Sequence, residues 1–147
     1  MTHRIVRVPL SEFLHITHSP DGCMNMQFGK HNHNHIGTVH ASAQYALAEI
    51  GTGALIADLY PEHRESAFAV LRRGEIKYTG SATSNLTAKA SLSDEKRKRL
   101  DAGLRRRGRA LVSVGVELLD AEGAVASRGR FEWYIELSRG VHSEEQP

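Results

Sequence analysis

The chain has only one cysteine and no hydrophobic run long enough to cross a membrane. Cys23 alone excludes an internal disulfide, and a single thiol is typical of a reducing compartment. A membrane-spanning helix needs about 18 consecutive apolar residues, and charged residues or histidines interrupt every candidate here. The first residues are not followed by the apolar segment of a signal peptide. We therefore expect a cytoplasmic protein that does not enter the membrane.

The chain also lacks a strong excess of charge and has few aromatic residues. Its net charge is +2, and aromatic residues make up 6% of its 147 residues. Nearly balanced charge argues against a general polyanion binder. Few aromatic side chains accompany the basic ones, so no stacking platform for single-stranded nucleic acid is expected. The length predicts one domain over residues 1–147, with a core at about 10–138 and a polar C-terminal tail from Ser138.

Positive charge is nevertheless concentrated in one segment, whose basic residues are Lys96, Arg97, Lys98, Arg99, Arg105, Arg106, Arg107 and Arg109. The pattern leaves open a solvated helix face, a patch that attracts a phosphorylated ligand, and a nucleic-acid surface, which it supports least. The second alternative predicts that Arg105, Arg106 and Arg107 lie near the mouth of a site and meet the phosphates of its ligand.

Alternating apolar residues and turn residues predict strands over much of the chain. The Ser19–Gly22 turn indicates a hairpin, because proline fixes φ and glycine accepts positive φ. Ser93 is a suitable N-cap for a short basic helix that ends near Gly108. A short helix or irregular segment is expected at 5–14 and a loop at 29–39. The expected strands are 13–17, 24–28, 67–71, 75–79 with a bend or bulge at Arg73-Gly74, 86–92, 110–119 and 125–137.

The segment from Ala41 to Leu59 predicts one long helix that is apolar on nearly every side. Such a helix must be covered all round, and a curved antiparallel β-sheet wrapped around it would do this, which gives an α+β fold. Gly51 and Gly53 are tolerable in the helix if another backbone packs closely there. The carboxylate of Glu49 lies in the middle of this helix, and a buried carboxylate needs either a partner or a task.

The residues around the start of this helix resemble the hot-dog fold acyl-CoA thioesterase superfamily, in particular the branch of phenylacetate-pathway thioesterases and their uncharacterised relatives. The matching residues are Asn34, Gly37, His40 and Glu49, within Gly37-Thr38-Val39-His40-Ala41 and Ala46-Leu47-Ala48-Glu49. The resemblance covers about residues 10 to 138, including the Asp120–Gly123 turn and the strand with Phe131 and Trp133. Two positions differ: the family's His-Gly-Gly is His40-Ala41-Ser42 here, and its more frequent aspartate is Glu49.

The resemblance implies hydrolysis of an acyl- or aryl-CoA thioester, with coenzyme A as part of the substrate and no separate cofactor. Glu49 would act as base or nucleophile, and Asn34 would orient the attacking water or hold the carbonyl. His40 would position these groups. Free amides at a helix start can polarise a carbonyl, and those of Ala41 and Ser42 lie about where the helix begins.

The same helix places these groups too far apart to act on one carbonyl within one chain. Ala41 and Glu49 are about 12 Å apart along a helix that rises 1.5 Å per residue. In hot-dog dimers the acid of one chain pairs with the helix start of the other. The resemblance therefore implies a homodimer or a dimer of dimers with two interface sites. The alternative is a module of the same fold that binds acyl-CoA or a fatty acyl group without hydrolysing it.

The histidine-rich loop invites a metal interpretation that its spacing does not support. His31, His33 and His35 alternate along an extended segment, but they match no standard catalytic zinc spacing and have no neighbouring acid or cysteine. We therefore predict no physiological metal site, and expect at most adventitious binding of nickel or zinc.

Overall fold

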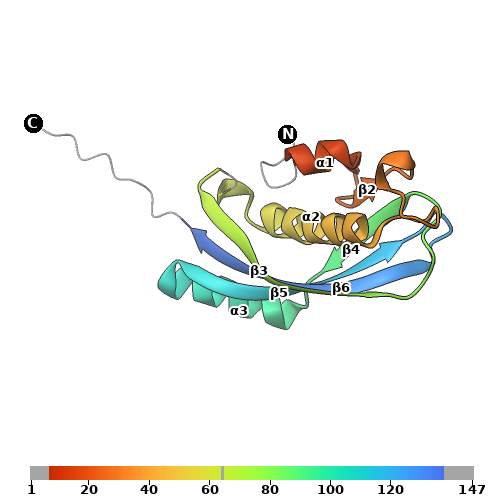
Figure 1. Ribbon diagram of the computed structural model, residues 1–147. Helices are drawn as coiled ribbons and strands as arrows, with labels where there is room; N and C mark the ends of the chain where they lie inside the picture. The colour runs from red at the N-terminus through yellow and green to blue at the C-terminus, as the bar shows by residue number, and fades with distance from the viewer. Residues whose placement is uncertain (1–6, 64, 138–147) are drawn as a thin grey trace, which may run out of the picture.

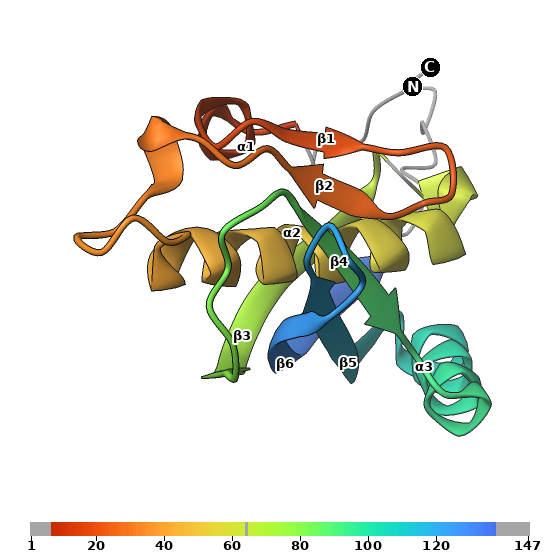
Figure 2. The ribbon, with the colours of Figure 1, turned by 90° about the vertical axis from the view of Figure 1, so that its right-hand side faces the viewer.

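One antiparallel sheet curves around one long helix in the computed structural model, which describes residues 7–63 and 65–137 (Figures 1 and 2). In spatial order the strands are β1 (Ile16–His18), β2 (Met24–Met26), β4 (Leu86–Ser91), β5 (Arg109–Leu119), β6 (Val125–Leu137) and β3 (Ala67–Tyr78). The helices are α1 (Pro9–Phe13), α2 (Ala41–Leu59) and α3 (Asp94–Arg107), with 3₁₀ turns at Lys30–Asn32 and Pro61–His63. The α+β arrangement predicted from the sequence, a curved antiparallel sheet around one central helix, is confirmed.

Helix α2 has the bounds that the sequence predicted, and most of it is buried. Small residues let the sheet approach it closely. At Gly51, an added Cβ atom would lie 2.8 Å from the Cβ atom of Ala88 on β4. The close packing expected at Gly51 is therefore found, against Ala88 of β4.

The inner face of the sheet forms the core with α2. Val112, Val114, Val116 and Leu118 of β5 are buried, as are Phe131, Trp133 and Ile135 of β6. The Phe131 ring occupies space that two glycines leave open, since Cβ atoms at Gly74 and Gly129 would come within 2.9 and 2.7 Å of it. Tyr45 of α2 completes this packing, with its ring edge-on to Phe131 at a centroid distance of 5.1 Å.

The sequence predicted two strands with a bend or bulge at Arg73-Gly74 between them, and the structure has one strand, β3, with a bulge. This strand is continuous from Ala67 to Tyr78 and pairs with β6 along its whole length. The pairing register shifts between Leu71 and Arg73, so Arg72 is the extra residue of a β-bulge. A bulge preserves strand pairing on either side, which is why the chain does not break here. Strand β3 also forms one edge of the sheet.

Helix α3 lies on the outer face of the sheet, opposite α2 (Figure 1). The Ser93 side chain caps its start, and Gly108 ends it with φ of 69°, as the sequence predicted. Leu100 and Leu104 are buried beneath it, and Gly103 allows close contact with Ala110 of β5. Most of the basic residues of this segment therefore lie on an outer helix, while Arg109 begins β5.

The predicted segment at 5–14 contains α1, although residues 5 and 6 and the tail from Ser138 lie outside the described residues. The Ser19–Gly22 hairpin turn and the turn at 120–123 are found where they were expected. Among the residues described, no helix has the length and apolar character needed to cross a membrane.

The contact between Gly51 and Ala88 predicts that the effect of Gly51→Ala on stability changes sign with the residue at position 88. Gly51→Ala alone should lower the free energy of unfolding by about 1 kcal/mol, because overpacking, about 1–3 kcal/mol, exceeds the gain of about 1 kcal/mol in helix propensity. In an Ala88→Gly background the same substitution should stabilise the protein. Urea unfolding of the four chains measures this, and an equal cost in both backgrounds would contradict it. Gly115→Ala is the control, since its Cβ atom would meet its nearest neighbour at an ordinary 3.6 Å.

Candidate active site at the start of the central helix

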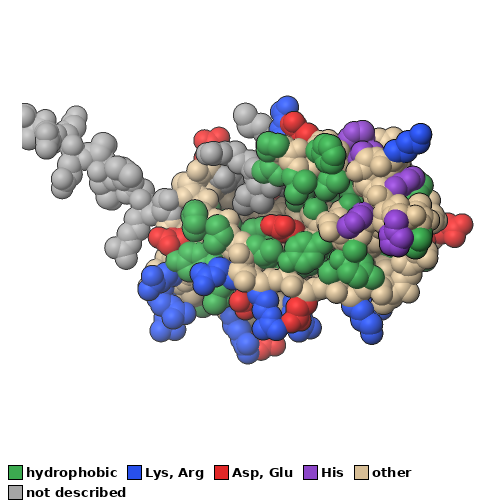
Figure 3. Space-filling view, in the orientation of Figure 1, with side chains coloured by type: hydrophobic (Ala, Val, Ile, Leu, Met, Phe, Trp, Pro, Cys, Tyr) green, Lys and Arg blue, Asp and Glu red, His purple; other side chains and the backbone are tan. Residues whose placement is uncertain are grey.

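The residues predicted to act together share one face of α2. Ala41, Tyr45 and Glu49 are spaced by four residues, so their side chains lie on the same side of the helix. Ala41 is exposed and the other two are partly exposed, whereas most of the helix is buried. Gly74 of the edge strand β3 lies directly beneath the Tyr45 hydroxyl. In Figure 3, hydrophobic side chains surround an acidic one over α2, and histidines gather towards the start of the helix.

The carboxylate of Glu49 has no hydrogen-bond or ion-pair partner within the part of the chain that the structure describes. Burial raises the pKa of this carboxyl above its ordinary value of 4.5, because low-dielectric surroundings disfavour the charged form. Its backbone carbonyl accepts a hydrogen bond from Thr52 Oγ1 at 2.8 Å, and Thr52 Oγ1 accepts one from Trp133 Nε1 at 2.9 Å. The backbone at Glu49 is thus held firmly, while the carboxylate stays open to a ligand.

The helix start is capped in a way the sequence did not reveal. His40 is the N-cap residue, and its Nδ1 atom accepts a hydrogen bond from the Ser42 amide at 3.0 Å. Of the two amides expected to polarise a carbonyl, that of Ser42 is therefore engaged. For the Ala41 amide, no acceptor lies among the described residues. The expected positional role of His40 is compatible with this cap.

Asn34 shapes the loop that leads to the helix. Its Oδ1 atom accepts hydrogen bonds from the Ile36 and Thr38 amides at 3.0 Å, and its Nδ2 atom donates to Thr38 Oγ1 at 2.7 Å. Gly37 closes this turn with φ of 79°. Only the second N–H of the Asn34 carboxamide remains to serve a water or a carbonyl, so this side chain acts mainly as a loop former.

Two tyrosines at the site, Tyr45 and Tyr78, were not predicted from the sequence. The Tyr78 hydroxyl donates to the Ala41 carbonyl at 2.9 Å and so ties β3 to the helix start. Burial, and secondarily the nearby Tyr45, raise the pKa of Tyr78. The four-residue spacing of Tyr45 and Glu49 could have identified Tyr45. No local signal marks Tyr78, because only the folded sheet brings it to the helix.

The structure does not bring the three arginines of α3 to this site. Arg105, Arg106 and Arg107 lie on the outer face of the sheet, whereas Ala41 and Glu49 lie on α2 over the inner face (Figure 1). Within one chain, these arginines therefore do not lie at the mouth of the α2 site. The helical pattern predicted α3 but held no information about which face of the sheet it covers.

The histidines of the loop make ring contacts. His31 stacks on His15 at a centroid distance of 3.9 Å, and His33 packs against Phe28 at 4.3 Å. Across residues 7–63 and 65–137, no group of three potential metal-binding side chains gathers in one place.

The cap at the helix start predicts a graded effect of substitution at His40. His40→Ala should lower the free energy of unfolding by about 1 kcal/mol, because the Ser42 amide loses its acceptor. His40→Asn should retain most of the stability, since asparagine is a strong N-cap residue. Thermal unfolding measures both, with His35→Ala in the exposed loop as the matched control. An asparagine variant no more stable than the alanine variant would contradict the role of the cap.

Comparison with known proteins agrees with this fold. The structure resembles OLEI01261, a protein of unknown function from Chlorobaculum tepidum (16% identity, 90% of this chain and 88% of that chain, TM-score 0.78). It also resembles BH2602 from Bacillus halodurans, whose structure was determined with CoA (16% identity, 88% of this chain and 76% of that chain, TM-score 0.70). A third similar structure is PA5026 from Pseudomonas aeruginosa, described as a probable thioesterase (24% identity, 79% of this chain and 76% of that chain, TM-score 0.65). No curated protein matches the chain.

The sheet wrapped around α2 and these likenesses define the hot-dog fold, so the fold implied by the sequence resemblance is confirmed. The chain itself belongs to the family described as a domain of unknown function, DUF4442, whose model matches residues 14–135.

Proposed function

We propose that this protein is an acyl-CoA thioesterase in which Glu49 is the general base. The observation that carries the proposal is the Glu49 carboxylate, which is partly buried, without a partner among the described residues, and raised in pKa by burial. A general base works best when its pKa approaches the working pH. A structural acid would instead be expected to have a hydrogen-bonded or charged partner.

The geometry supports hydrolysis by activated water. Glu49 would take a proton from water as the water oxygen bonds to the thioester carbonyl carbon. The Ala41 amide would stabilise the oxyanion of the resulting tetrahedral intermediate. The carbon–sulfur bond would then break, and the proton would pass to the leaving sulfur to give a carboxylic acid and the CoA thiol.

The site is proposed to need two chains, because Ala41 and Glu49 of one chain are about 12 Å apart along α2. The partly exposed face of α2 lies beside β3, whose twelve residues form an edge of the sheet. Such an edge readily pairs with another strand, and pairing of two β3 strands would place the helices of two protomers side by side. The structures similar to this one include the CoA complex of BH2602 and the thioesterase HI1161 from Haemophilus influenzae.

One observation favours a second candidate, a module that binds acyl-CoA without hydrolysing it. The Ser42 amide already donates to His40, so a bound carbonyl meets fewer free donors than an oxyanion hole requires. Under this alternative, acyl-CoA would bind with measurable affinity and release no thiol.

Thiol release from short, long and aryl acyl-CoAs tests the proposal. The thioesterase is expected to turn over at least one of these classes and to sediment as a dimer or larger assembly. Binding with no thiol release from any substrate would support the second candidate. A monomer that is fully active would overturn the two-chain site.

A further inference from the structure

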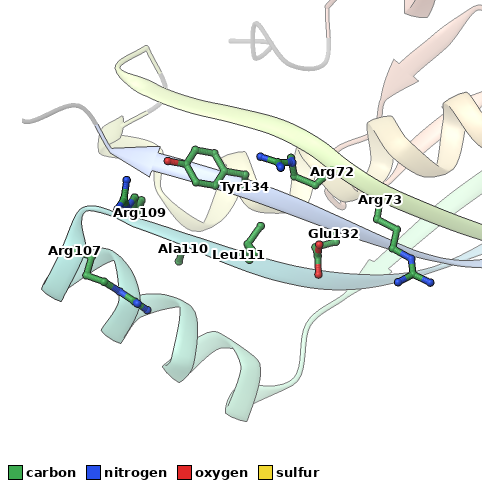
Figure 4. Close-up of a pocket in the computed structure, with 8 residues that line it drawn as sticks. All are labelled: Arg72, Arg73, Arg107, Arg109, Ala110, Leu111, Glu132 and Tyr134. Atoms are coloured by element: carbon green, nitrogen blue, oxygen red, sulfur yellow. The ribbon is translucent and has the colours of Figure 1, made fainter.

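A second site candidate lies on the outer face of the sheet, where a cleft of about 600 Å³ runs between α3 and strands β5, β6 and β3 (Figure 4). Four arginines line it: Arg72, Arg73, Arg107 and Arg109. They come from three different elements, so the cluster is a product of the fold and could not be recognised in any one segment of the sequence. The sheet separates this cleft from the Glu49 site within one chain.

Two irregularities of the backbone bring these arginines together. In a regular strand, successive side chains point to opposite faces of the sheet. The bulge in β3 instead lets the neighbours Arg72 and Arg73 line the same cleft. At the end of α3, the left-handed Gly108 reverses the chain, so Arg107 and Arg109 line the cleft from either side of the turn.

The charges in the cleft favour an anion. Four guanidinium groups face one lining carboxylate, that of Glu132. Arg73 is paired with Glu75 on the same strand, but no ion pair to Arg72 or Arg107 occurs in the described ranges 7–63 and 65–137. Cations gathered without counter-charges repel one another, and a bound anion relieves this cost. The planar guanidinium group matches phosphate oxygens in two-point hydrogen bonding.

The cleft also offers an apolar surface beside the cations. Leu111 lines it with a 58% exposed side chain, unusual for a leucine, and the Tyr134 ring lies next to it on β6. Tyr134 is in contact with the exposed ring of Phe68 at a centroid distance of 6.5 Å. Exposed aromatic and aliphatic side chains of this kind hold flat rings by stacking.

We propose that this cleft binds a nucleotide carrying at least two phosphate groups. Arg72 and Arg107 hold the phosphates, and the base lies on Tyr134 and Leu111. The nucleotide can be free or can be the nucleotide end of coenzyme A, because both present the same phosphates and base. The site does not depend on the thioesterase reaction, since none of its residues lies on α2.

Isothermal titration of the intact chain at low salt tests this proposal with adenosine 3′,5′-bisphosphate, ATP and adenosine as probes. The phosphorylated probes should bind and adenosine should not. Arg72→Gln and Arg107→Gln should each weaken binding about tenfold, because each removes a charged hydrogen bond to phosphate. Arg106→Gln is the matched control: it has the same charge change, on the neighbouring residue of α3, but lies outside the cleft. It should leave the affinity within about twofold.

The remaining outcomes separate the sources of the ligand and the competing explanations. Tighter binding of coenzyme A than of ATP, with no binding of pantetheine, assigns the cleft to the nucleotide end of coenzyme A, whereas the reverse order assigns it to a free nucleotide. Absence of binding by the wild type, or equal weakening by Arg106→Gln, overturns the proposal. Affinity for single-stranded oligonucleotides that grows with their length would also overturn it, in favour of nucleic acid. Glu49→Gln should bind the nucleotide normally, so failure of the thioesterase proposal does not affect this result.

Discussion

Glu49→Gln is expected to reduce kcat for acyl-CoA hydrolysis by about 10²- to 10⁴-fold, the usual contribution of a positioned general base. The substitution preserves the size and polarity of the side chain but removes its ability to accept a proton. Thiol release on the best substrate of the wild type measures the effect. Asp58→Asn is the matched control, because it removes one negative charge from an exposed position further along α2. Retention of full turnover by Glu49→Gln would contradict the role of Glu49 as base.

The raised pKa of Glu49 predicts that activity and stability change in opposite directions with pH. Activity requires the ionised carboxylate, so kcat/KM should increase as the pH rises through the pKa of Glu49. Because burial raises this pKa, the increase should occur above 4.5, the ordinary pKa of a glutamate carboxyl. Stability should change in the other direction, because the folded state binds this proton more tightly than the unfolded state. The wild type therefore loses stability as the pH rises through the pKa of Glu49 in the folded protein.

Glu49→Gln has no such loss and should melt at a higher temperature than the wild type at neutral pH. The difference should vanish below the ordinary carboxyl pKa, where the acid is protonated in both states. Thermal unfolding across this pH range measures it. A variant less stable than the wild type at neutral pH would instead indicate an acid with a structural partner.

Phe131→Ala should have the largest effect on stability, about 3–5 kcal/mol of the free energy of unfolding. The ring is completely buried and fills the space above Gly74 and Gly129, where no other side chain can replace it. Such a loss approaches the whole stability of many domains, so Phe131→Leu provides a milder variant, with an expected cost of about 1.5 kcal/mol or less. Urea unfolding followed by the fluorescence of Trp133, the single tryptophan, measures both.

Phe68→Ala serves as the control for this prediction. Phe68 is 57% exposed on the neighbouring strand β3, so its removal should cost less than about 1 kcal/mol. Similar losses for the two phenylalanine-to-alanine variants would show that the Phe131 contacts do not dominate the core. The loss of Phe131 should also release Tyr45, which packs on its ring at the edge of the Glu49 site.

The elements that follow from short-range pattern were predictable, and the features set by long-range packing were not. Alternation along β5 and β6 and the apolar run of α2 identify these elements because each depends on neighbours in the sequence. A bend or a bulge was predicted at Arg73-Gly74, but the pattern alone did not decide between them, and the strand in fact continues through a bulge at Arg72.

The candidate site was predictable to a similar extent. Glu49 was found because a carboxylate in an apolar helix is conspicuous in any sequence. The cap of the Ser42 amide by His40 depends on a side-chain rotamer, and the contact of Tyr78 with Ala41 depends on the curvature of the sheet. Neither contact can be recognised from a sequence pattern.

The hydrogen bond from Trp133 to Thr52 settles a problem that the composition of α2 creates. A cylinder that is apolar on almost every side can turn about its own axis with little change in the area it buries, so hydrophobic contact alone does not choose its orientation. The buried Thr52 hydroxyl has a donor at only one angle of rotation, where Trp133 Nε1 meets it at 2.9 Å. At other angles the buried Nε1–H of Trp133 would lose this acceptor, and burial of an unmatched polar group is costly. The hydrogen bond from Trp133 thus fixes the rotation of the helix about its axis, and with it the partly exposed position of Glu49, three residues before Thr52.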